Sequence, residues 1–183
     1  MLFRSQFLKN KYKLSNQHLA PVQFFRLRPV NFPTIRLAQL AALYTKENQL
    51  FSKLMAAKSK KDIAAYFNVQ TSPFWDTHYS FTSTSAKRKK SISSSFIDLV
   101  IINTIAALKF CYAKEQAKDV SQEIATLIES LPAEKNRITD KFNSLKPVAQ
   151  NALQSQALIE LKNNYCTPNK CLQCAVGNHL IGR

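Results

Sequence analysis

The scarcity of glycine is the feature that most constrains this chain. It has 183 residues but only two glycines, Gly177 and Gly182, where about a dozen would be usual at this length. Loops that cradle phosphate in P-loop, Rossmann and kinase proteins need glycine where the backbone meets the phosphate, so those classes are excluded. Tight β-hairpin turns need glycine or asparagine at positive φ, so a β-sandwich or barrel is disfavoured. Both glycines follow a cluster of cysteines, where we expect them to let the tail turn.

Positive charge is large and unevenly distributed. The formal net charge is +15, from 26 basic and 11 acidic side chains. Residues 1–90 carry 16 basic and 3 acidic side chains, whereas residues 91–183 carry 10 and 8. A one-sided field of this kind favours polyanions, which include nucleic acid, an anionic membrane or an acidic partner domain. The alternative is a surface whose charge serves solubility alone.

Apolar side chains recur at helical spacing through most of the chain, which predicts an all-α fold. We expect one domain over residues 1–183, with six to eight helices packed around a central apolar helix near residues 96–112. Residues 68–94 and the cysteine-bearing tail, residues 165–183, are expected to be irregular. After Pro33 we expect an amphipathic helix with Leu37, Leu40, Ala41 and Tyr44 on its apolar face. The predicted helices cover residues 2–13, a segment after Pro33, residues 47–57, a short segment capped by Ser59, and residues 95–114, 119–130, 132–145 and 147–164.

Neither a secretory signal nor a membrane span is predicted. The first 14 residues carry four basic side chains and lack a continuous apolar stretch. Residues 96–112 are the most apolar segment, but Asp98 and Lys109 interrupt it and it is short for a bilayer. We therefore expect a cytoplasmic protein that does not insert into a membrane.

Three of the four cysteines, Cys166, Cys171 and Cys174, lie within nine residues. The two-residue spacing of the last pair is typical of chelating turns. We therefore predict a metal site that holds zinc or an iron–sulfur cluster, with either His179 or Cys111 as the fourth ligand. The alternative is a set of reduced structural cysteines or a disulfide pair. Cys111, on an apolar helix, is expected more as a small core residue than as a ligand.

Two basic clusters are candidate phosphate ligands. Arg26, Arg28 and Arg36 flank a proline-rich turn that leads into a helix, where guanidinium and backbone N–H groups can meet a phosphate. The alternative is that these arginines pair with Asp76, Asp98 or a carboxylate elsewhere in the chain. The second cluster is a run in a serine-rich loop that either is solvated or contacts phosphate. It consists of Lys87, Arg88, Lys89 and Lys90.

The aromatic segment at residues 75–79 contains two groups able to transfer protons. Asp76 and His78 are two residues apart, so they would share one face of an extended strand. A packed loop with aromatic anchors is the more common use of such a segment. The cysteines have no His–Asp partner that would support nucleophilic catalysis. We therefore expect no catalytic residues and no enzyme activity of this chain on its own.

Several collinear motifs resemble one bacterial family. They lie at residues 25–41, 75–79, 101–104, 131–136, 151–158 and 166–178. Together they are similar to members of domain-of-unknown-function family 2851. The resemblance implies a longer protein of which this chain is the C-terminal half, and whose other half has an acidic motif like that of PD-(D/E)XK nucleases. It also includes the cysteine trio, whereas Cys111 and His179 are not firm features of the family.

Two functions follow as expectations. In the first, the chain is an accessory helical module with a C-terminal cysteine metal site and a basic surface that binds nucleic acid or another polyanion. In the second, it is a structural or interaction domain that packs on an acidic partner or on the missing N-terminal half, without binding nucleic acid. The second predicts an exposed apolar patch near residues 2–14.

Overall fold

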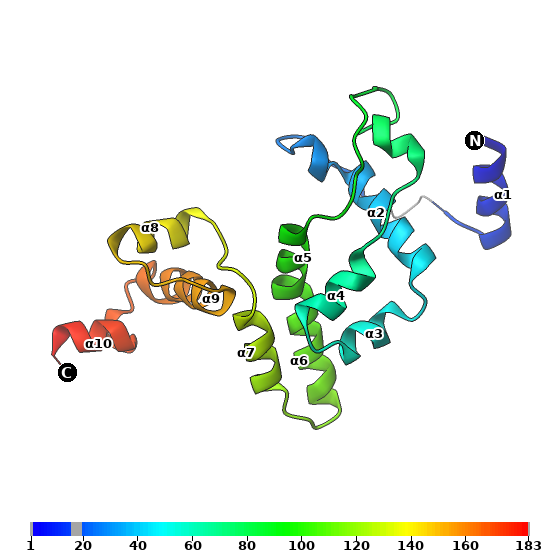
Figure 1. The fold of residues 1–183 in the computed structure, drawn as a ribbon. Helices are drawn as coiled ribbons and strands as arrows, with labels where there is room; N and C mark the ends of the chain where they lie inside the picture. Colours follow the sequence, from blue (N-terminus) through cyan, green and yellow to red (C-terminus); the bar gives the residue numbers. More distant parts are fainter. Residues whose placement is uncertain (1, 16–19, 183) are drawn as a thin grey trace.

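The chain folds into helices, most of them joined by short turns, with a longer irregular segment between Phe67 and Ser94. The computed structural model describes residues 2–15 and 20–182. Within these ranges it contains no β-strand (Figure 1), which confirms the all-α fold. The α-helices are α1 (Leu2–Tyr12), α2 (Pro33–Lys46), α3 (Leu50–Ala56), α4 (Lys60–Phe67), α5 (Ser94–Val100), α6 (Ala106–Glu115), α7 (Ser121–Glu129), α8 (Arg137–Leu145), α9 (Ala152–Glu160) and α10 (Ala175–Ile181).

The helices follow one another across the molecule. In Figure 1, α2 to α6 lie together, α7 lies beside α6, and α8 to α10 continue to the opposite end. Helix α7 packs against both α6 and α9, and so joins the two groups. Helix α1 stands apart from the other helices in the same view.

The predicted central helix is present, but it buries only one of its faces. The π-helical segment Ile101–Ile105 joins α5 to α6, so Ser94–Glu115 is one continuous helix. Ile97, Ile101 and Ile105 pack in the core, whereas the next turns leave large apolar side chains exposed. By length and composition this helix is apolar enough to cross a membrane, and core helices of soluble proteins pass the same test.

Asparagine caps set the starts of α8 and α9 later than expected. The side chain of Asn136 accepts the N–H groups of Ile138 and Thr139 at 2.9 and 3.1 Å. Asn151 accepts the N–H of Gln154 at 2.9 Å. Because side-chain oxygens that satisfy free N–H groups favour helix starts, these residues begin the helices in place of the prolines at 132 and 147. The tail also differs from the expected loop, since it ends in α10.

The predicted cap at Ser59 is present as a reciprocal pair. The Ser59 hydroxyl accepts the N–H of Asp62 at 3.2 Å, and the Asp62 carboxylate accepts the N–H of Ser59 at 3.1 Å. The carboxylate also accepts the Ser59 hydroxyl proton at 2.7 Å. This side-chain hydrogen bond is the main reason that the pKa of Asp62 is lowered. The carboxylate therefore stays charged at the start of α4, where the helix dipole favours it.

Candidate anion-binding pocket

A basic pocket lies between the start of α2 and the segment that leads into α5. Its volume is about 420 Å³. Residues 28–39 form one wall and residues 88–99 form the other. Its polar lining combines cations with hydroxyl groups. The basic residues are Arg28, Arg36, Arg88, Lys89 and Lys90, and the serines are Ser91, Ser93 and Ser95.

The guanidinium of Arg36 is held in one orientation. It donates to the side-chain oxygens of Gln39 and Asn31 at 2.9 and 2.6 Å. Its central carbon lies 3.5 Å from the centre of the Phe96 ring, a cation–π contact. Partial burial lowers the pKa of Arg36, although arginine remains charged at neutral pH. The arrangement uses two of the five N–H donors and fixes the direction of the others.

Gln39 links α2 to the basic run at residues 87–90 by hydrogen bonds. Its side-chain amide is buried and donates to the backbone carbonyls of Lys90 and Ser91 at 2.9 and 3.2 Å. Sequence reasoning missed this residue. The available signal was its position, because Gln39 lies four residues from both Ile35 and Leu43 and interrupts an apolar stripe. A polar side chain on a buried face requires partners, and here those partners are the loop carbonyls.

Lys90 stabilises the basic loop by hydrogen bonds to two carbonyl groups. Its side chain is buried, and its ammonium group donates to the carbonyls of Asp76 and Arg88 at 3.2 and 3.1 Å. The same group lies 3.9 Å from the centre of the Tyr79 ring. Lys90 therefore supports the pocket wall, while the neighbouring Arg88 and Lys89 line the pocket with exposed side chains.

The segment at residues 75–79 supports the basic loop. The carbonyl of Asp76 accepts the N–H of Arg88 at 2.7 Å. The ring of His78 stacks on Phe74 with centroids 4.0 Å apart, and its Nδ1 lies 2.9 Å from the Phe74 carbonyl. Trp75 packs edge-on against Phe74. This geometry corresponds to the packed aromatic loop and does not pair Asp76 with His78.

No acidic side chain forms an ion pair with a cation of the pocket within the described residues. The expected alternative was an ion pair from Arg26, Arg28 or Arg36 to a carboxylate. Asp98 instead pairs with Lys60 at 2.6 Å, and the other ion pairs among the described residues involve Glu47 and Glu123. Within the described residues, the basic side chains that line the pocket therefore form no ion pair.

Two of the seven predicted phosphate ligands lie outside the pocket lining. The guanidinium of Arg26 lies 5.0 Å from the centre of the Phe25 ring, and Arg26 adopts a left-handed backbone conformation with φ of 59°. Lys87 is an exposed residue that precedes the pocket-lining part of the basic run. The other five residues of the two predicted clusters line the same pocket.

A helix-ending turn separates the first two clustered cysteines. The π-helical segment Leu161–Cys166 continues α9 to Cys166. Asn169 then adopts the left-handed conformation, with φ of 56°. The N–H of Asn169 donates to the carbonyl of Cys166 at 3.2 Å, and that of Lys170 donates to the carbonyl of Tyr165 at 2.8 Å. These two bonds make a Schellman motif, which reverses the chain toward Cys171.

The cysteines do not converge on a common point. Cys166 and Cys171 are exposed and Cys174 is buried. Cys111, expected in the core, is instead exposed on α6, because the buried face of this helix carries Ala106, Lys109 and Ala113. In the described ranges no group of three or more His, Cys, Asp or Glu side chains could hold a metal ion. Metal binding by the trio, with His179 or Cys111 as the fourth ligand, therefore stays a prediction from the sequence.

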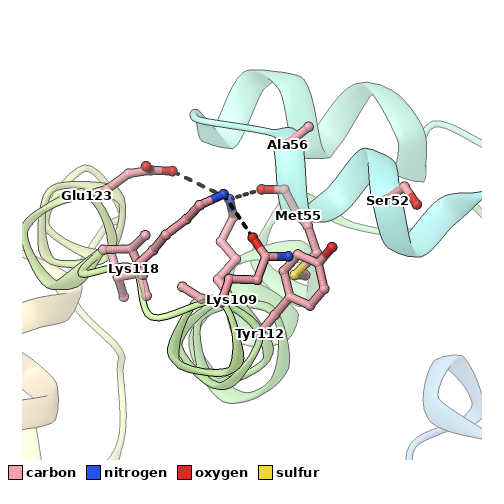
Figure 2. Close-up of a pocket in the computed structure, with 11 residues that line it drawn as sticks. Ser52, Met55, Ala56, Lys109, Tyr112, Lys118 and Glu123 are labelled. Atoms are coloured by element: carbon pink, nitrogen blue, oxygen red, sulfur yellow. Dashed lines mark hydrogen bonds and ion pairs between the residues drawn. The ribbon is translucent and has the colours of Figure 1, made fainter.

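A second pocket is built around a buried lysine (Figure 2). Lys109 is only 6% exposed. Its ammonium group donates to the carbonyl of Met55 at 2.7 Å and lies 3.5 Å from a carboxylate oxygen of Glu123. Met55 lies in the last turn of α3, where carbonyls have no partner within the helix. Lys109, which only interrupts an apolar stretch in the sequence, therefore joins α6 to the end of α3 and to α7.

We expect Lys109→Met to lower the free energy of unfolding by about 1–3 kcal/mol, because the partly buried Met55 carbonyl loses the donor that the buried Lys109 side chain supplies. Chemical denaturation followed by circular dichroism measures the effect. The matched control is Lys114→Met, which changes an exposed lysine of the same helix and is expected to alter stability by less than about 0.5 kcal/mol. Equal effects of the two substitutions would contradict this role for Lys109.

The fold and the pocket together define an all-α protein with a basic pocket, whose cations form no ion pair with the described acidic residues. A family model described as "Protein of unknown function (DUF2851)" matches residues 1–137, and the chain belongs to this family. Residues 138–183, which include the three clustered cysteines, lie outside the matched range. No curated protein matches the chain. No solved structure matches it either.

Proposed function

We propose that this protein binds the phosphate backbone of nucleic acid in the basic pocket. One observation carries the proposal: Arg28, Arg36, Arg88 and Lys89 line a single pocket in which the described residues provide no carboxylate partner. They come from two segments about 50 residues apart, which Gln39 ties together. Four cations placed side by side repel one another, and a polyanion removes that repulsion.

The pocket chemistry suits phosphate oxygens. Arg36 is already oriented by Asn31, Gln39 and Phe96, so little side-chain entropy is lost when it binds an anion. The serine hydroxyls along the opposite wall are further donors of the kind that contact phosphates. Phosphate contacts set the position of a protein on nucleic acid but carry no sequence information. We therefore expect binding with little dependence on base sequence.

A salt titration tests the proposal. The affinity for a short fluorescein-labelled DNA duplex is measured by anisotropy at increasing KCl concentration. Each phosphate contact contributes about −0.9 to the slope of log affinity against log salt, so four contacts give about −3.6. We expect Arg28→Gln, Arg88→Gln and Lys89→Gln each to reduce the steepness of this slope by about 0.9.

The matched control is Lys146→Gln, which removes an exposed cation beyond the end of α8. It should leave the slope unchanged. The proposal is wrong if the three pocket variants keep the slope of the unmodified protein, or if Lys146→Gln changes it as much as they do.

A further inference from the structure

An apolar groove of about 600 Å³ adjoins the basic pocket. Helix α2 forms one side, and α3 together with the continuous helix α5–α6 forms the other. Three side chains, Arg36, Gln39 and Phe96, line both the groove and the basic pocket. The groove is therefore an apolar surface with one positively charged end.

The α2 side of the groove is the apolar face that the sequence predicts for this helix. Leu37, Leu40 and Tyr44 are 56%, 47% and 63% exposed. They are spaced three and four residues apart, so they form one stripe along the helix. Phe51 and Leu108, on the other side, are also exposed. Large contiguous apolar surfaces on proteins commonly mark interaction sites, and a row at helical spacing fits the ridges of another helix.

Charge decides what kind of helix fits. Among the described residues, Arg36 is the one charged residue in the lining of the groove. Arg28, Arg88 and Lys89 lie beyond it in the basic pocket. Acidic side chains at this end of a docked helix would meet guanidinium groups with no carboxylate partner among the described residues. Arginine and carboxylate form strong paired hydrogen bonds in such positions.

Helix α1 does not supply that complement, and the acidic helix α7 already packs against α6 and α9. Helix α1 stands apart in Figure 1 and exposes Phe7 and Tyr12, the exposed apolar patch expected near residues 2–14. However, α1 carries Lys9 and Lys11 and no acidic residue, so it would bring like charge to the groove. A second copy of the protein would present its own Arg36 and basic pocket, which again repels. Charge therefore favours a partner of different sequence.

We propose that the groove binds an amphipathic helix of an acidic partner protein. The apolar side of that helix lies over Leu40 and Tyr44, and its acidic residues lie against Arg36. This inference goes beyond nucleic-acid binding. Because Arg36 belongs to both surfaces, DNA and the helix compete for it, whereas the far end of the groove serves the helix alone.

Two synthetic helical peptides test the groove without any nucleic acid. Both carry the same leucine stripe, and their remaining positions are glutamate in one and lysine in the other. We expect the glutamate peptide to bind in an anisotropy titration and the lysine peptide to bind at least about tenfold more weakly, which is about 1.4 kcal/mol. The double variant Leu40→Gln/Tyr44→Gln should weaken the glutamate peptide by a similar factor, and Arg36→Gln should reduce the preference for glutamate over lysine.

The matched control is Leu145→Gln, which removes an apolar side chain that is 86% exposed on α8 and should leave peptide binding unchanged. Circular dichroism verifies that each variant folds. The double variant should keep the salt dependence of DNA binding, so the failure of one proposal is distinguishable from the failure of the other.

Several results would overturn the groove proposal. Among them are no binding of either peptide, equal binding of both, and unchanged binding by the double variant. A concentration-dependent dimer in light scattering that the double variant abolishes would assign the groove to a second copy. Sedimentation with phosphatidylglycerol vesicles that the double variant abolishes would assign it to a lipid surface.

Discussion

Replacing Ile101 with alanine is expected to lower the free energy of unfolding by about 2–5 kcal/mol. Ile101 is fully buried and belongs to the core cluster that also contains Ile63 and Leu127. It opens the π-helical segment between α5 and α6, so its removal leaves a cavity where these helices meet the rest of the core. The loss is a large part of the roughly 5–15 kcal/mol that stabilises a typical domain.

Urea denaturation of Ile101→Ala and of a matched control measures this effect. The control is Ile181→Ala, which removes the same atoms from a side chain that is 53% exposed at the end of α10. We expect the control to change the stability by less than about 0.5 kcal/mol. If the two substitutions cost the same, Ile101 does not lie in the cooperative core.

Helix periodicity predicts where this chain is helical better than it predicts which face is buried. The all-α fold, the Ser59 cap and the long apolar helix follow from local signals. For α2 the predicted apolar face is exposed, and the buried face carries Ile35, Gln39 and Leu43. This helix has apolar residues on both sides, so spacing alone cannot choose between them. The choice depends on Gln39, whose amide meets loop carbonyls about 50 residues away.

The basic pocket shows a similar limit of the sequence. Net charge and composition indicate that Arg28, Arg36 and the run at residues 87–90 are candidate phosphate ligands. They do not show that these two segments lie side by side. Their meeting depends on Gln39 and on the buried ammonium of Lys90, which donates to two carbonyls. Whether an arginine pairs with a carboxylate is likewise a tertiary property, and Asp98 is already paired with Lys60.

Cysteine spacing is a local pattern, so it says little about where the thiols point. The two-residue spacing of Cys171 and Cys174 does mark a turn, since the N–H of Cys174 donates to the carbonyl of Cys171 at 3.2 Å. The direction of each side chain depends on how this turn, η5 (Cys171–Gln173), packs against α10. This packing involves Gly177, which the sequence suggested as a flexible turn residue but which lies inside α10.

We expect Gly177→Ala to push α10 away from the cysteine turn. A Cβ atom at this position would lie 2.2 Å from the backbone carbonyl oxygen of Cys171, a distance that real Cβ atoms essentially never show. Helix propensity alone would make Gly177→Ala stabilise α10 by about 1 kcal/mol. The close contact with Cys171 outweighs this gain, so we expect the substitution to be destabilising. Overpacking of this kind costs about 1–3 kcal/mol, which corresponds to a roughly 5- to 150-fold increase in the population with α10 undocked.

Thiol labelling measures that population. Cys174 is 8% exposed, whereas the other three cysteines are exposed, so a thiol reagent should modify one group slowly and three quickly. Gly177→Ala should accelerate the slow reaction by a factor in the range above. The matched control is Gly182→Ala, because a Cβ at Gly182 meets no atom within 4 Å.

The φ of 77° at Gly182 makes this control strained, but the strain lies at the end of α10, away from Cys171. An unchanged slow phase in Gly177→Ala, or equal acceleration in both variants, would show that contact between α10 and the cysteine turn does not protect Cys174.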